Sequence, residues 1–198
     1  MMTLVALIDR AKARALTYNI VTPSTSGTKI PPFNSTYTNP HVLFLLNFTT
    51  AQRSALLSAP STLALLYTPA NEHFGIGPIE GMLCGLPVLA CNSGGPTESI
   101  VDDPPEERTG WLCAPDPQIW ADALCEIVGM PEGEREALAQ RSRTRARALF
   151  GMEAMAKGLE TALRDAVALG PVELSSLWLI LVGFILAYLL GPWLLPNP

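Results

Sequence analysis

Apolar and polar positions form short alternating blocks along the first two thirds of the chain, and these blocks predict strands and helices in turn. Short apolar runs predict five strands, at residues 18–21, 42–46, 63–67, 88–90 and 110–114. Amphipathic or capped segments predict helices at residues 1–16, 50–57, 78–84, from 96 onward, 117–128, 132–149 and 152–169. This alternation predicts an α/β fold with a parallel sheet and helices on both of its faces.

Two stretches depart from this alternation. Residues 22–40 are rich in Ser, Thr, Pro and Asn without periodicity, which predicts a loop. Residues 42–46 are apolar throughout, so we expect this strand to be covered on both faces.

The C-terminal stretch Leu174–Leu195 has 22 residues without a charge. As a helix it would be about 33 Å long at about 1.5 Å per residue, which is enough for a hydrocarbon core of about 30 Å. Trp178 and Trp193 lie near its ends, as interfacial anchors do. The sequence therefore predicts a membrane helix at residues 174–195. Gly183 and the Gly191-Pro192 pair interrupt the stretch, so a hairpin within one leaflet is the alternative.

Composition limits the partners and cofactors. The net charge of −5 and the absence of a basic patch with interleaved aromatic residues exclude nucleic acid as an expected partner. The dense basic run at residues 141–147 is interpreted as a solvated helix face. Four cysteines without a C-x-x-C pair, together with only two histidines, give no zinc-ligand spacing, so we expect no metal.

The candidate chemistry lies in residues 71–90, which predict a loop, a short helix and a buried strand. Glu72 falls in the loop and Glu80 in the first turn of the helix, with seven residues between them, so both carboxylates can face one crevice. Gly75 and Gly77 let backbone amides approach a ligand, and a helix N-terminus attracts phosphate. Because carboxylates accept hydrogen bonds from sugar hydroxyls, the pattern indicates a nucleotide-sugar site. The alternative is a surface turn with two solvated charges.

The next predicted strand leads into Gly94-Gly95-Pro96. Ligands of parallel sheets bind beyond the carboxyl ends of the strands, so Glu72 and Gly94 are expected at the same edge. The neighbouring His73 either contacts the ligand or packs against the protein.

This arrangement resembles the E-x7-E signature of the retaining GT-B glycosyltransferases, and more closely the α-1,3/1,6-mannosyltransferases of the dolichol pathway. The resemblance extends from about residue 4 to 169 and is carried by residues 16–21, 45–48, 66–69, 72–76, 87–90 and 94–98. It implies a Rossmann-like sheet that forms the C-terminal lobe of a GT-B fold, with the N-terminal lobe missing. The expected domains are a donor-binding lobe at residues 1–170 and the membrane segment at residues 174–195.

The resemblance further implies GDP-mannose as the donor. It assigns Glu72 to the transferred mannose, as the candidate catalytic residue, and Glu80 to the ribose. It assigns the backbone of residues 74–77 to the diphosphate, and the glycine pair to the sugar or base. The expected donor contacts are Glu72, His73, Phe74, Gly75, Ile76, Gly77, Glu80, Gly94 and Gly95.

The implied acceptor is dolichol-diphosphate-linked oligosaccharide, which is elongated with retention at the cytosolic face of the endoplasmic reticulum membrane, with other mannosyltransferases of the pathway as further partners. The sequence departs from the family because the Arg/Lys pair that grips the diphosphate and the acceptor lobe are both missing. Neither Lys29 nor Arg53 replaces that pair. The chain is therefore expected to be a fragment lacking the acceptor lobe. The alternatives are a non-catalytic nucleotide-sugar-binding subunit and a membrane-anchored interaction module with a decayed site.

Overall fold

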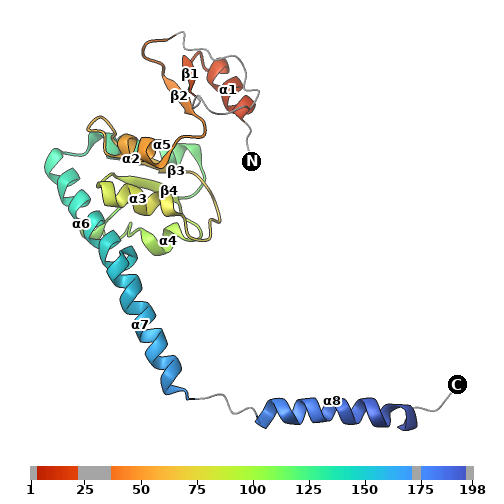
Figure 1. Cartoon of the computed structure of the whole chain (residues 1–198). Coiled ribbons are helices and arrows are strands. Elements are labelled where there is room, and N and C mark those ends of the chain that lie inside the picture. The colour runs from red at the N-terminus through yellow and green to blue at the C-terminus, as the bar shows by residue number, and fades with distance from the viewer. Residues whose placement is uncertain (1–3, 22–36, 171–174, 195–198) are drawn as a thin grey trace. The chain divides into compact units, whose positions relative to one another are not determined.

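The computed structural model describes residues 4–21, 37–170 and 175–194 (Figure 1). Its strands are Tyr18–Val21 (β1), Val42–Leu45 (β2), Leu65–Tyr67 (β3), Val88–Cys91 (β4) and Trp111–Cys113 (β5). Its helices are Leu4–Ala13 (α1), Thr50–Leu57 (α2), Ile76–Cys84 (α3), Pro96–Ser99 (α4), the 3-10 helix Pro105–Glu107 (η1), Pro117–Gly129 (α5), Glu132–Phe150 (α6), Met152–Ala168 (α7) and Ser175–Leu194 (α8). The chain divides into two compact units, Met1–Ala146 and Arg147–Pro198. The predicted functional domains, 1–170 and 174–195, stay predictions.

All strand pairings in the described residues are parallel, which confirms the predicted strand direction. The strands form two sheets, however, with β1 beside β2 in one and β3, β4 and β5 in that order in the other. The prediction of a single sheet is therefore wrong.

The predicted burial of residues 42–46 on both faces is also wrong, because Leu43 in the two-stranded sheet is 49% exposed. Most of the predicted loop 22–40 lies outside the described residues.

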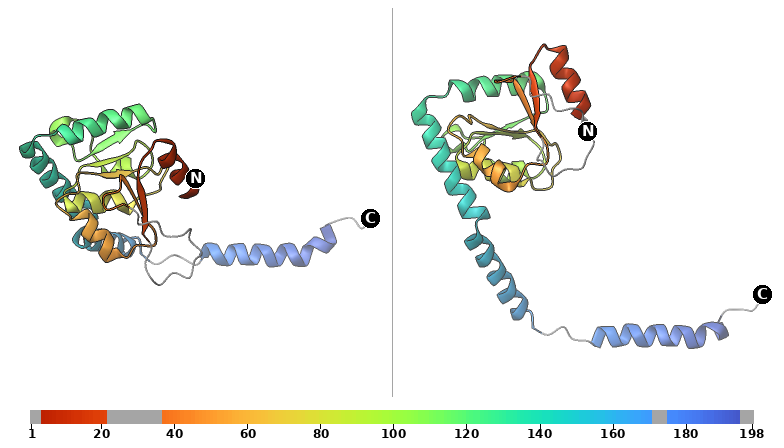
Figure 2. Two further views of the ribbon diagram at one scale, coloured as in Figure 1. Left: turned by 90° about the horizontal axis from the view of Figure 1, so that it is seen from above. Right: turned by 45° about the horizontal axis from the view of Figure 1, so that its top comes forward.

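The core of the first unit is centred on β4, in which all four residues are buried. The helices α3 and α5 lie on opposite faces of the three-stranded sheet (Figures 1 and 2), where α3 contacts β3 and β4, and α5 contacts β4 and β5. A cluster of Leu89, Trp111, Cys113, Ala123, Ile127 and Leu138 fills the space on the α5 side. A strand covered on both faces explains the continuous apolar run at residues 88–90.

The polar signals that delimit the helices act as the sequence predicts. Thr49 begins α2 with a capping box, in which its hydroxyl accepts from the Gln52 amide while the Gln52 side chain accepts from the Thr49 amide. Asp116 caps α5 by accepting from two backbone amides. Gly85 ends α3 with a φ of 78°, a left-handed conformation that glycine adopts without strain.

Three of the four arginines of the basic run, Arg141, Arg143 and Arg145, are engaged with the protein, so the interpretation as a solvated face is wrong for these three; Arg147 is exposed. Arg143 donates to the carbonyl of Cys84 at the end of α3, at 3.2 Å. Arg145 donates to the carbonyls of Ser99 and Glu98 in α4, at 2.8 and 3.0 Å. The last carbonyls of a helix have no partner within that helix, and guanidinium groups from α6 supply the missing donors.

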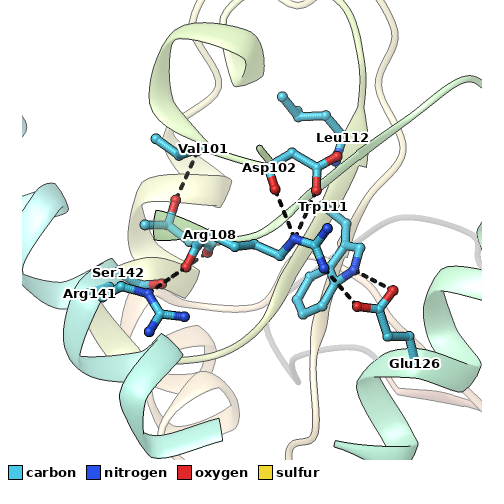
Figure 3. A network of polar contacts seen from close by, with 9 residues as sticks. Val101, Asp102, Arg108, Trp111, Leu112, Glu126, Arg141 and Ser142 are labelled. Carbon is cyan, nitrogen blue, oxygen red and sulfur yellow. Dashed lines mark hydrogen bonds and ion pairs between the residues drawn. The ribbon is translucent and has the colours of Figure 1, made fainter. Parts of the chain in front are cut away.

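A polar network around the start of β5 joins α6 to α5 (Figure 3). The Arg108 guanidinium lies 2.7 Å from Glu126 and 3.1 Å from Asp102, and its carbon is 5.2 Å from the centre of the Trp111 ring. Trp111 donates through its indole N–H to the other oxygen of Glu126, at 3.1 Å. Arg141 in turn donates to the Arg108 carbonyl at 2.9 Å. These contacts fix the loop before β5 to the helices that follow it.

The second unit contains α7 and α8. The predicted helix at residues 174–195 is present as Ser175–Leu194, with exposed apolar side chains from Leu177 to Leu190. Within the described part of the chain, however, no helix combines the length and the hydropathy needed to cross a bilayer. The prediction of a membrane-spanning helix is thus not supported.

The arginine contacts predict unequal effects of two substitutions within one basic run. Arg145→Met removes the two charge-assisted hydrogen bonds that the α4 carbonyls accept from the guanidinium, so we expect the free energy of unfolding to fall by about 1–3 kcal/mol. Arg147→Met, at an exposed position, should change it by less than about 0.5 kcal/mol. Urea unfolding followed by circular dichroism measures both. If Arg145→Met lowers the free energy of unfolding no more than Arg147→Met does, the Arg145 contacts contribute nothing beyond what an exposed arginine contributes.

Candidate nucleotide-sugar site

Two loops meet at the carboxyl edge of the three-stranded sheet, one after β3 and one after β4. The amide of Gly95 donates to the carbonyl of Glu72 at 2.7 Å, and the amide of Asn71 donates to the Ser93 hydroxyl at 3.0 Å. Because β3 and β4 are adjacent and parallel, their carboxyl ends bring these loops together. Glu72 and Gly94 therefore do lie at one edge, as the alternation of elements predicts.

The glycine pair allows the two loops to approach closely. A Cβ added to Gly94 would overlap the Glu72 carbonyl oxygen, and one added to Gly95 would overlap the Phe74 carbonyl oxygen. Gly94 also has a φ of 62°, in the left-handed region. These positions require glycine because they support the loop that carries Glu72. A direct contact of either glycine with the donor stays a prediction.

Tyr67, the last residue of β3, is a site residue that the sequence patterns did not indicate. A Cβ on Gly75 or Gly77 would come within 3.2 or 2.9 Å of the Tyr67 ring, so the ring packs against both glycines. Its hydroxyl lies 3.5 Å from Oε2 of Glu72. Burial, followed by the negative charge of Glu72, raises the pKa of Tyr67 above 10.0. The hydroxyl therefore stays protonated at neutral pH and can donate toward the carboxylate.

Glu80 lies in the second turn of α3, since the helix begins at Ile76, and the prediction of a first-turn position is wrong. Its Oε1 is 2.6 Å from the Arg53 guanidinium of α2. Both side chains line a cavity of about 190 Å³ whose walls are otherwise mostly apolar. Arg53 thus lies beside Glu80, although its position on a predicted helix did not indicate this contact. Lys29 lies outside the described residues.

The N-terminus of α3 lies between the two glutamates along the chain. Its N-cap residue is Gly75, with a φ of 80°, and glycine has no side chain to cap the N–H groups of the first turn. His73 is exposed, and Phe74 and Ile76 are 42% and 65% exposed. Donor contacts by these residues stay predictions, as does a common crevice for Glu72 and Glu80.

With this geometry established, comparison with known proteins identifies the family. Residues 35–145, more than half of the chain, match the family described as glycosyl transferases group 1. The chain belongs to the group 1 glycosyl transferases. The matched residues include both loops of the site, together with Tyr67 and Arg53.

Curated proteins similar to this chain include α-1,3/1,6-mannosyltransferases named ALG2, which confirms the resemblance noted from the sequence. The protein from Neurospora crassa is 37% identical over 93% of this chain and 37% of its own length. The protein from Rhizomucor pusillus is 34% identical over 82% of this chain and 33% of its own length. The human protein is 40% identical over 60% of this chain and 27% of its own length. The chain therefore spans about a third of the length of these relatives.

Solved structures support the fold. Sucrose-phosphate synthase from Thermosynechococcus elongatus aligns with a TM-score of 0.52 and 28% identity, over 65% of this chain and 31% of its own. Anabaena HepE, solved in complex with UDP-glucose, aligns with a TM-score of 0.51 over 62% of this chain and 32% of its own. At 23% identity it supports the fold alone. The predicted α/β class with a GT-B-like lobe is thus confirmed, apart from the membrane helix.

The glycine contacts predict a site-specific cost of adding one methyl group. Gly95→Ala keeps an allowed backbone, since φ is −53°, but drives the new Cβ into the Phe74 carbonyl. We expect the free energy of unfolding to fall by about 1–3 kcal/mol, as overpacking does elsewhere. Gly133→Ala in α6, where a Cβ meets nothing within 4 Å, should be neutral or stabilising by up to about 1 kcal/mol. Thermal unfolding of both variants measures the difference, and an unchanged Gly95→Ala protein would refute the packing role.

Proposed function

We propose that this chain carries the donor-binding site of a mannosyltransferase, which transfers mannose from GDP-mannose to dolichol-diphosphate-linked oligosaccharide with retention, in α-1,3 and then α-1,6 linkage. The observation that carries the proposal is the E-x7-E loop held against the glycine pair at the carboxyl edge of the sheet. The similarity of the chain to α-1,3/1,6-mannosyltransferases over most of its length supports the choice of mannose as the transferred sugar.

The two glutamates have separate roles in this proposal. Glu72 accepts hydrogen bonds from mannose hydroxyls and holds the sugar while its bond to the diphosphate breaks. Glu80 accepts from the ribose hydroxyls. Each carboxylate is half-buried, so a hydrogen bond to it is stronger than one made in open water.

The diphosphate occupies the N-terminal end of α3, with His73, Phe74 and Ile76 beside it. Negative charge grows on the diphosphate as the glycosidic bond breaks, and the partial positive charge of the helix end stabilises it. The uncapped amides at Gly75 and Gly77 provide the donors. The reaction therefore uses no metal or other cofactor in this proposal.

A lipid-linked acceptor places the reaction at a membrane surface. We place the site on the cytosolic side of the endoplasmic reticulum, where GDP-mannose is available, with other mannosyltransferases of the pathway as neighbours. In this proposal the candidate site residues are assigned to the donor alone.

Donor titration tests the glutamate roles. Isothermal titration of the full chain with GDP-mannose and with GDP should give saturable binding of both. Glu72→Gln should weaken GDP-mannose roughly tenfold or more and leave GDP unchanged, since GDP has no mannose. Glu80→Gln should weaken both by a similar factor. Glu107→Gln, in the exposed η1, is the control and should bind like the parent chain.

Absence of saturable GDP-mannose binding by a folded chain would refute the proposed function. A transfer assay with lipid-linked acceptor, with and without a separate acceptor lobe, then distinguishes catalysis from binding alone. Donor binding without transfer under either condition would indicate a non-catalytic nucleotide-sugar-binding subunit.

A further inference from the structure

Arg53 and Glu80 form a direct ion pair between neighbouring helices, α2 and α3, which lie side by side (Figures 1 and 2). The guanidinium nitrogen lies 2.6 Å from Oε1 of Glu80, a short contact in which the guanidinium donates a charge-assisted hydrogen bond to the carboxylate. The two side chains are 39% and 25% exposed. The pair is thus neither fully solvated nor sealed in the core.

Local contacts fix the helix from which Arg53 extends. The capping box of Thr49 and Gln52 sets the start of α2, and the Arg53 amide donates to the Thr49 carbonyl at 3.0 Å. Arg53 therefore occupies the first turn of a helix whose beginning is well defined, and its side chain reaches α3 from a fixed origin. An arginine at a frayed helix end would not orient its partner in this way.

The surroundings of the pair favour orientation over simple charge neutralisation. Five of the nine residues that line the shared cavity are apolar: Leu45, Phe48, Leu56, Leu57 and Leu65. A carboxylate beside apolar walls has few alternative donors, so one guanidinium controls its rotamer. The ion pair is made through Oε1, which leaves Oε2 as the oxygen assigned to an incoming ligand.

We propose that Arg53 is a positioning residue, which holds Glu80 so that Oε2 accepts hydrogen bonds from the ribose hydroxyls of the donor. This inference rests on the proposed function, because it assigns the nucleoside to Glu80. Arg53 itself touches neither the ribose nor the transferred sugar. The competing explanation is that the pair only connects α2 to α3.

Ribose discrimination separates these two explanations. The probes are GDP and 2′,3′-dideoxy-GDP, which differ only in the hydroxyl groups that Glu80 would bind. The parent chain should bind GDP roughly tenfold or more tightly than the dideoxy compound, as expected for hydrogen bonds to a carboxylate. In Arg53→Gln this ratio should fall to about threefold or less, while the affinity for dideoxy-GDP stays unchanged, because the lost interaction involves only the ribose. Arg53→Lys keeps the positive charge and should retain most of the ratio.

The chain offers a matched control in α7. Arg164 forms an ion pair with Glu160 at the same distance, 2.6 Å, and lies outside the candidate site. Arg164→Gln should leave the ratio of the two affinities unchanged. Thermal unfolding of every variant reports any loss of stability separately from ligand discrimination.

Two results would overturn the inference. If Arg53→Gln lowers the affinity for both ligands equally, Arg53 acts on the fold or on the diphosphate and does not position Glu80. If it changes only the unfolding temperature, the pair merely connects the helices. Failure of the parent chain to bind either ligand would instead contradict the proposed function, so the two failures are distinguishable.

Discussion

The candidate site depends on the close approach of two backbones, the loop of Glu72 and the turn at Gly94-Gly95. Their contact is a main-chain hydrogen bond of 2.7 Å, with no space for a side chain on either glycine. Backbone contacts of this kind position a loop more precisely than pairs of flexible side chains, because they involve no rotamers. The adjacent parallel strands β3 and β4 deliver both partners to the same edge. The position of Glu72 is therefore a consequence of strand order as much as of local sequence.

The helix α6 extends this support to the elements behind the site. Arg143 binds the carbonyl end of α3, and Arg145 binds that of α4. Both helices begin at the candidate site and end against α6, so their orientation is constrained at both ends. The network around Arg108 and Trp111 anchors β5 to the same helix through Arg141 (Figure 3).

Local signals in the sequence predicted the elements well, and long-range contacts account for what they missed. The capping residues Thr49 and Asp116 and the terminating Gly85 act within a few residues of their own position, so the local sequence reveals them. The contact of Arg145 with α4 spans 46 residues, and spacing along one helix cannot indicate it. The exposure of Leu43 was missed for the same reason, because an apolar run does not reveal whether both faces of a strand are covered.

The same distinction applies to the site. The E-x7-E pattern and the glycines are contiguous in sequence, and the pattern alone indicates carboxylates near a helix N-terminus. Of the partners of those carboxylates, Arg53 comes from α2, far from Glu80 in the sequence, whereas Tyr67 lies only five residues before Glu72, at the end of β3. Glu72 sits on a loop and has a neutral hydroxyl as its neighbour, whereas Glu80 sits on a helix and has a cation. A carboxylate beside a cation is held more firmly than one beside a hydroxyl at 3.5 Å. Of the two acids, Glu72 thus retains the greater freedom to adjust, which suits the acid assigned to the sugar whose bond breaks.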